Sequence, residues 1–425
     1  MADSIQVSTS KRISLHEDWT VVILGFLIII LSIAGFVIPV PSFSWKNSEE
    51  LFGKVLSAEN LGKAALQFVF VFAIALMAVY LINKSVKSAL KTFPLLFALT
   101  FIALVLSGNS EVKALNLESV IFSLSIGLVV SNVFKLPTWM RESLSAELFV
   151  KIGLVLLGTG VIFSDILKAG GLGLIQALVV VLSVWYFAFW ICKKLKVDEE
   201  LTMMISSAVS ICGVSAAIAT AGAIKGDTKK LSYVISLVLI TAIPMMIFMP
   251  YIARYFHFPE AVTGAWLGGS IDTTGAVVAS GTLVGETALK ISTIVKFSQN
   301  VLLGLAAFAI SIYWTYSKRT NGDKNNVAKP TLGLIWERFP KFVLGFVAAS
   351  LLFSFVVNAE TISTVKDSLK SVQALWFVLA FTSIGLETKF SDLFNSNSKK
   401  PLYGFLIAQT FNILVTLVIA YFLFG

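Results

Sequence analysis

Charged residues are scarce in this sequence of 425 residues. Asp, Glu, Lys and Arg together make up only 13% of the chain, which is about half the share found in soluble domains. Hydrophobic residues make up 57%, and the mean hydropathy is +0.87. The composition therefore excludes a soluble globular protein and predicts an all-α polytopic membrane protein, with the lipid bilayer as its main partner.

Cysteine and histidine are almost absent, which excludes several kinds of site. Cys192 and Cys212 lie in or beside apolar runs and form no Cys-x-x-Cys pair, so neither a disulfide framework nor a metal site is expected. His16 and His257 are far apart, and no Ser-His-Asp set or phosphate-binding loop occurs. We therefore expect no enzyme, no cofactor and no ATP-driven pump. The net charge is +9, but the sequence contains no stripe of basic and aromatic residues of the kind that binds nucleic acid. No nucleic-acid partner is therefore expected.

Apolar runs predict thirteen segments that can enter the hydrocarbon core of a bilayer. Two of them, 200–224 and 263–284, are interrupted by glycines and hydroxyls and are predicted to be broken, re-entrant segments. If both crossed instead, the chain would have thirteen spans. The re-entrant alternative is favoured because it keeps the basic loop after 224 on the same side as the other basic loops. It leaves about eleven transmembrane helices near 20–40, 64–82, 92–107, 117–134, 147–163, 172–192, 231–249, 289–316, 334–357, 372–388 and 401–424.

Lys and Arg gather on alternate loops, which predicts a cytoplasmic N-terminus and a periplasmic C-terminus. Residues 1–19 are polar and contain no signal-peptide core, so they are predicted to be a cytoplasmic tail. The remaining predicted divisions are a first membrane region, 20–316, which includes both broken segments, a cytoplasmic linker, 317–333, and the C-terminal membrane helices, 334–425.

A weak internal echo links two parts of the chain. "LGTGVIFSDIL" (157–167) and "IGLETKFSDLF" (384–394) share a glycine, Phe-Ser-Asp and an apolar pair at one offset. The charge pattern makes the two stretches run in opposite directions across the membrane. Inverted-topology repeats of this kind are typical of secondary transporters, which bind substrate where the repeats meet.

The first broken segment is "SAVSICGVSAAIAT" (207–220), in which Ser210, Cys212, Gly213 and Ser215 interrupt an apolar run. Taken alone, these small residues favour a close contact between helices. Gly213 also lowers helix stability by about 1 kcal/mol relative to alanine. Irregular backbone at membrane depth is tolerated where protein or a water-filled cavity surrounds it, so a binding site is the alternative.

The second broken segment, "LGGSIDTTGAVVASG" (267–281), changes that preference because it carries an acid. Glycines isolate Ser270, Asp272, Thr273 and Thr274 as a predicted unwound tip. An ionisable residue within the membrane is a functional-site hypothesis by default. A plain helix N-cap at Asp272 is the structural alternative. The two readings are compatible, since a helix that begins at membrane depth offers free N–H groups to an anion.

A third group follows in "STIVKFSQN" (292–300). Lys296, Gln299 and Asn300 share one helix face and are predicted to point into the bundle. Lys296 either pairs with Asp272 or faces a cavity and attracts an anion. Thr159, Ser383 and Glu387 are lesser cavity candidates whose neighbouring glycines equally suit close packing, and Lys151 is expected to extend towards the membrane interface.

These motifs, in this order, resemble the YeiH-type family of bacterial membrane proteins, which carries a sulfate-exporter label. The resemblance rests on "SSAVSICGVSAAIA", "WLGGSIDTTGAVVASG" and "TIVKFSQNVLLG" and extends through "KIGLVLLGTGVIF" and "ALWFVLAFTSIGLETKFSDL". It implies a bacterial inner-membrane location and anion export. The chain departs from the family pattern at Asp272–Thr273, where a His-Glu pair is typical, and at Gln299, where arginine is typical, so sulfate is not carried over unchanged.

The sequence therefore predicts a secondary active transporter, with export the favoured direction, for a small anionic solute such as a sulfur oxyanion or an organic anion. One helix bundle would move against the other, coupled to a proton or sodium through Asp272. Moving-bundle transporters also suggest a homodimer by analogy. The alternatives are an anion channel and a membrane sensor or scaffold that transports nothing. The predicted substrate-binding residues are Ser210, Cys212, Gly213, Ser215, Ser270, Asp272, Thr273, Thr274, Lys296, Gln299 and Asn300.

Overall fold

A computed structural model describes residues 15–115, 117–320, 333–388 and 399–425, and in these ranges helices are joined by turns and short extended loops. A single isolated β-bridge, Trp45 to Asn109, is the only strand-like pairing in the described ranges. The predicted all-α class is therefore confirmed. Most of the predicted linker 317–333 and the second half of the echo at 384–394 lie outside the described residues.

Nineteen α-helices and three short π- or 3₁₀-helical turns make up the described chain. In chain order they are α1 (Glu17–Ile33), α2 (Ser48–Glu50), η1 (Leu51–Val55), α3 (Ala58–Leu81), α4 (Val86–Ser107), α5 (Ser110–Ala114), α6 (Ser119–Val133), α7 (Thr138–Ser143), α8 (Ala146–Leu157), η2 (Gly158–Gly160), α9 (Phe163–Lys194), α10 (Glu199–Ser210), α11 (Val214–Ile224), α12 (Thr228–Tyr255), α13 (Glu260–Ser270), α14 (Thr274–Val284), α15 (Glu286–Thr320), α16 (Gly333–Arg338), α17 (Lys341–Leu351), η3 (Leu352–Val356), α18 (Ala359–Glu387) and α19 (Lys400–Phe424).

Eight helical stretches among the described residues are long and apolar enough to cross a membrane. They are α3, α4, α7 to η2, α9, α12, α15, α18 and α19. The chain is therefore a polytopic membrane protein. The three other predicted spans correspond to shorter elements, α1, α6 and α17 with η3, so the total of eleven spans stays a prediction.

Several predicted spans differ from the structure at their ends; α9, for example, begins at Phe163 and not near 172. The span predicted at 20–40 ends as a helix at Ile33, because Gly35 adopts φ +96° and closes the last turn, with the Phe36 amide donating to the Leu31 carbonyl at 3.0 Å. The span predicted at 372–388 is the second half of α18, which already begins at Ala359 with Asn358 as its N-cap. The polar residues before 372 continue the helix beyond the apolar run.

Each of the two broken segments forms a hairpin of two short helices. In the first hairpin, α10–α11, the Asp227 amide just after α11 donates to Glu200 near the start of α10, at 3.1 Å. In the second, α13–α14, Gly285 just after α14 lies against Glu260 at the start of α13, where an added Cβ would be 3.1 Å from Oε1. Both segments therefore return to the end at which they began.

The hairpins begin at opposite ends of α12, which joins them. Since α12 has 28 residues, it is about 42 Å long at 1.5 Å per residue. Their tips nevertheless meet, because an added Cβ at Gly213 would lie 3.0 Å from Cβ of Asp272. The hairpins therefore approach one middle level from opposite sides.

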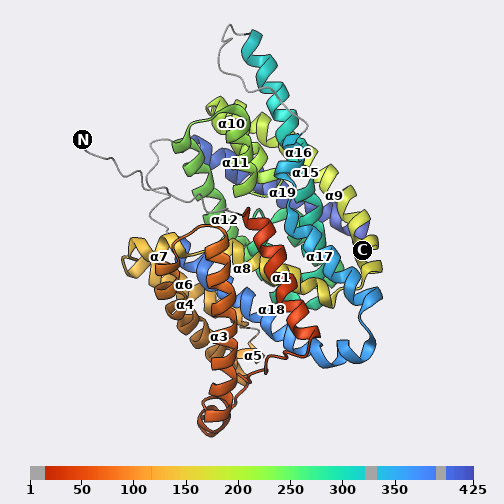
Figure 1. The fold of residues 1–425 in the computed structure, drawn as a ribbon. Coiled ribbons are helices and arrows are strands. Elements are labelled where there is room, and N and C mark those ends of the chain that lie inside the picture. Colours follow the sequence, from red (N-terminus) through yellow and green to blue (C-terminus); the bar gives the residue numbers. More distant parts are fainter. Residues whose placement is uncertain (1–14, 116, 321–332, 389–398) are drawn as a thin grey trace, which may run out of the picture.

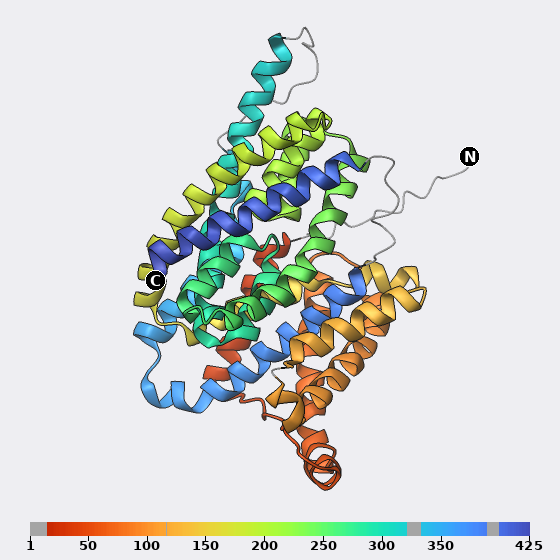
Figure 2. The same ribbon diagram turned by 180° about the vertical axis from the view of Figure 1, so that it is seen from behind.

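The helices pack as two bundles (Figures 1 and 2). The support bundle contains α1, α3, α4, α6, α8, α17 and α18, and α18 packs along both α6 and α8. The hairpin bundle contains both hairpins with α9, α12, α15 and α19. In Figure 1 the α10–α11 hairpin lies in the upper part, below the far end of α15, and α3, α4 and α6 lie at the lower left. Between the bundles, α14 contacts α6, α8 and α18, and α17 contacts α9.

Candidate functional site

The tip of the first hairpin requires glycine. Gly213 has φ +61°, a conformation that side chains with a Cβ rarely adopt. An added Cβ would also lie 2.6 Å from Val238 Cγ1 of α12. The break at Gly213 is therefore specified twice, by its backbone angle and by the close approach of α12 and the second hairpin.

The carbonyl ends of α10 and α13 are buried and receive donors from long polar side chains. Lys296 Nζ, on α15, donates to Ile211 O and Ile271 O, at 2.8 Å each. Further donors to these two ends come from Gln176, Gln299, Gln409 and Asn412, which bond carbonyls of residues 265, 269, 270 and 209. An unsatisfied carbonyl in hydrocarbon costs several kcal/mol. By bonding these carbonyls, the side chains lower the free-energy cost of placing the two helix ends inside the membrane.

Lys296 has no donor left for a solute. Its ammonium carries three N–H donors, and a third acceptor, Gln299 Oε1, lies at 3.1 Å. The side chain is 1% exposed. No ion pair within 4.0 Å joins Lys296 to Asp272 in the described chain, so neither the expected direct ion pair nor the expected exposure to a cavity is present. Lys296 instead joins the two hairpin tips.

Asp272 lies at the second tip, next to the carbonyl that Lys296 binds. It is 2% exposed, and its Oδ2 has no hydrogen-bond partner among the described residues. The N-cap of α14 is Thr273, whose hydroxyl accepts from the Ala276 amide at 3.3 Å, so Asp272 does not cap the helix. Its carboxyl group is therefore buried at the tip with one oxygen unpaired among the described residues.

The opposite ends of the half-helices, the N-termini of α11 and α14, face a cavity of about 430 Å³. An α-helix leaves its first N–H groups without partners inside the helix. Each N-terminus also carries roughly +0.5 elementary charge. Residues 214 and 215 of α11 and 274 to 276 of α14 line this cavity, so its deep end presents two positive helix ends at once.

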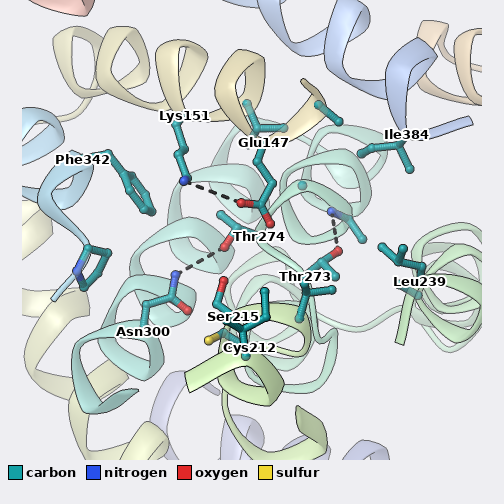
Figure 3. Close-up of a pocket in the computed structure, with 18 of the residues that line it drawn as sticks. Glu147, Lys151, Cys212, Ser215, Leu239, Thr273, Thr274, Asn300, Phe342 and Ile384 are labelled. Atoms are coloured by element: carbon teal, nitrogen blue, oxygen red, sulfur yellow. Dashed lines mark hydrogen bonds and ion pairs between the residues drawn. The ribbon is translucent and has the colours of Figure 1, made fainter. Parts of the chain in front are cut away.

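The cavity lies between the two bundles. The hairpin bundle contributes α11, α12, α14 and α15, and the support bundle contributes α1, α8, α17 and α18. Figure 3 shows Lys151 and Glu147 of α8 on one side of it and Ser215 and Cys212 on the other. Thr273 and Thr274 lie between them, and the Asn300 amide donates to the Thr274 hydroxyl at 3.3 Å. A shift of one bundle relative to the other would therefore change the shape of the cavity.

The predicted site residues fall into two groups. Five of the eleven line the cavity, namely Cys212, Ser215, Thr273, Thr274 and Asn300. The other six lie around the point where the hairpin tips meet and do not line the cavity, namely Ser210, Gly213, Ser270, Asp272, Lys296 and Gln299. Ser210 donates back to the Ser206 carbonyl at 2.7 Å, while the Ser270 hydroxyl is buried without a partner in the described chain.

Several cavity residues are absent from the predicted set. Lys151 lines the cavity instead of extending to the membrane interface, and it pairs with Glu17 at 2.7 Å and Asp18 at 3.0 Å. Glu387, one of the three lesser cavity candidates, also lines it and accepts from the Ala146 amide at 3.0 Å, whereas Thr159 and Ser383 do not line it. The sequence does not reveal this role of Lys151, because its acidic partners lie in α1, more than 130 positions earlier. Gly158 and Gly385, beside the lesser candidates, pack tightly against backbone of α17 and α6.

No group of three or more His, Cys, Asp or Glu side chains in the described ranges could hold a metal ion. The polar groups at the tips are helix ends, hydroxyls, amides, the Lys296 ammonium and the Asp272 carboxyl, and the cavity wall adds the charged side chains of Asp18, Glu147, Lys151 and Glu387. The fold and site thus define a polytopic membrane protein with two opposed hairpins meeting beside a cavity.

The chain belongs to a family described as conserved hypothetical protein 698, whose model matches residues 66–404. It is 40% identical over 314 residues to a UPF0324 membrane protein of Rhodopirellula baltica, covering 71% of this chain and 57% of that protein. A UPF0324 membrane protein of Nitratidesulfovibrio vulgaris is 39% identical, covering 71% and 54%. The chain thus spans just over half the length of these bacterial relatives, whose names state a membrane protein and no substrate. No solved structure matches the chain.

Proposed function

We propose that the chain is a secondary active transporter of a small anionic solute in a bacterial inner membrane, with export the favoured direction. One observation carries the proposal: the N-termini of α11 and α14 converge on one cavity. Two helix ends supply about one positive charge in total, which suits one small anion. A cavity of about 430 Å³ is within the usual size of small-molecule sites. A sulfur oxyanion or an organic anion is the proposed solute class.

The acids on the cavity wall do not oppose an anion as strongly as their number suggests. Asp18 pairs with Lys151, and its second oxygen accepts from the Lys341 amide at 3.0 Å. Glu147 also pairs with Lys151, at 3.6 Å, and Glu387 accepts from the start of α8. Among the described residues, no side chain of the opposite wall bonds the N-termini of α11 and α14, and the side-chain bond at the α14 end comes from its own cap, Thr273.

The proposed mechanism is alternating access, in which the hairpin bundle moves against the support bundle with coupling to a proton or sodium. Opposed hairpins whose bases lie at the two ends of α12 support inverted-topology repeats, which place substrate at their interface. Between the bundles, α14 contacts α6, α8 and α18, and α17 contacts α9, so these helices would slide against their neighbours during the movement. Eleven spans and a homodimer belong to this proposal.

The first test is a thermal-stability screen of the purified full chain with sulfur oxyanions, carboxylates and halides. A ligand at one hundred times its dissociation constant stabilises the folded protein by about 2.7 kcal/mol. Ser215→Asp should weaken the response at least about tenfold, since its carboxylate offsets the α11 end while stabilising the helix. Thr361→Asp, in the first turn of α18 and outside the cavity, should respond like the wild type.

Absence of stabilisation by every anion would favour a sensor or scaffold over a transporter. Anions that bind are then tested in proteoliposomes. Saturable counterflow is expected of a transporter, whereas flux without counterflow would indicate an anion channel.

The proposed orientation, with the N-terminus cytoplasmic, makes a separate prediction. Glu147 and Glu286 have similarly exposed side chains, 62% and 59%, but lie towards opposite ends of the molecule. Glu387, beside the start of α8, and Lys370, which pairs with Glu286, are about 25 Å apart along α18. In a cysteine-free chain, a membrane-impermeant thiol reagent should label Glu286→Cys in intact cells and Glu147→Cys only in inverted vesicles.

The reverse labelling pattern would overturn the orientation. Labelling of both positions in intact cells would instead show a pathway open across the membrane, as in a channel.

A further inference from the structure

The carbonyl ends of α10 and α13 form an oxygen-lined position between the hairpin tips. Ile211 O, Ile271 O and Gln299 Oε1 all point at the same atom, Lys296 Nζ, within 3.1 Å. The Asp272 carboxyl follows Ile271 directly and has a buried Oδ2 with no partner in the described chain. The three groups that bond Lys296 Nζ are all acceptors.

The charge at this position is also that of a cation site. Each half-helix C-terminus carries roughly −0.5 elementary charge, so the two together match one positive charge. Main-chain carbonyls and half-helix C-termini are the groups that hold Na⁺ in transporters with broken helices, and carbonyl oxygens can replace the hydration shell of a monovalent ion. Here the ammonium of Lys296 fills the position.

We propose that Lys296 is a tethered cation in a monovalent-cation site, so that the protein holds its hairpin tips together without bound Na⁺. Removing the side chain down to Cβ leaves an oxygen-lined space that accepts Na⁺. The consequence for coupling, that transport by the wild type does not require Na⁺, rests on the proposed function. The cation site itself does not.

The test compares two substitutions of Lys296 in the purified full chain. Lys296→Ala opens the space, whereas Lys296→Met removes the charge and keeps the space filled. Thermal unfolding is followed as NaCl replaces choline chloride at constant ionic strength, together with saturable binding of radioactive Na⁺. The unfolding temperature of Lys296→Ala should rise with Na⁺ to a plateau, while the wild type and Lys296→Met should show no Na⁺-specific rise.

Three results would overturn the proposal. The first is a Na⁺-specific stabilisation of the wild type, which would place a sodium site elsewhere or beside Lys296. The second is a Lys296→Ala response equal to that of Lys296→Met. The third is a Lys296→Ala protein that does not fold even when prepared in Na⁺. A Lys296→Ala protein that folds only in Na⁺ would support the proposal. No anion is needed, so the outcome is independent of the anion screen.

Discussion

Replacing Lys296 with methionine is expected to lower the free energy of unfolding by about 2–6 kcal/mol, because two buried carbonyls lose their donor and each such loss costs about 1–3 kcal/mol. Methionine keeps a long unbranched side chain, so little space is left empty. It removes the donor that Ile211 O and Ile271 O share at 2.8 Å. Both carbonyl ends then lie buried without their shared donor, and the two hairpins lose their joint attachment to α15.

The measurement is chemical and thermal unfolding of the full chain in detergent. Lys290→Met is the matched control, because Lys290 lies on the same helix and pairs with Glu286 at 3.0 Å, with 28% and 59% of the two side chains exposed. Exposed pairs contribute at most about 1 kcal/mol. Equal losses in Lys290→Met and Lys296→Met would show that the ammonium does not hold the tips.

A double substitution tests whether Asp272 contributes to the same charge balance. Residues in one charged network show interaction free energies of about 0.5–3 kcal/mol. Lys296→Met with Asp272→Asn is therefore expected to lose less stability than the sum of the two single changes. Strict additivity would show that the helix ends alone, without Asp272, balance the charge of Lys296.

The helical fold and both hairpins could be predicted from the sequence, because each depends on local features. Long apolar runs locate the helices, and the clusters of glycine and hydroxyl residues near 213 and 272 locate the breaks. The helix ends were less predictable. The helix α18 begins at Ala359, well before its apolar run, since a helix need not end where the hydrocarbon does.

The role of Lys296 could not be predicted, although its place in the site could. Its partners are main-chain carbonyls, which every residue has and no sequence pattern marks. Gln409 and Asn412 were overlooked for a different reason. They are isolated polar residues in the apolar helix α19, and their spacing of three, continued by Thr416, is the signal that places them on one helix face.

Asp272→Asn is expected to abolish accumulation of the anion driven by a pH gradient while leaving anion exchange intact. Asp272 directly precedes Thr273, the N-cap of α14. An ionised carboxylate there offsets the positive helix end that the anion would otherwise use, whereas a protonated one does not. Proton and anion therefore bind together in the wild type. Asparagine fixes the neutral form, so the variant binds the anion without regard to this proton.

The measurement pairs anion affinity at several pH values with proteoliposome flux, in the wild type, in Asp272→Asn and in Asp367→Asn. Asp367 is an exposed acid on α18 and serves as the control. The wild type and Asp367→Asn should bind more tightly as Asp272 becomes protonated and should accumulate anion when a proton gradient is imposed. Retained accumulation in Asp272→Asn would move the coupling role to Glu147 or Glu387, which, unlike Asp272, line the cavity. Loss of exchange in a folded Asp272→Asn protein would instead make Asp272 part of the solute site.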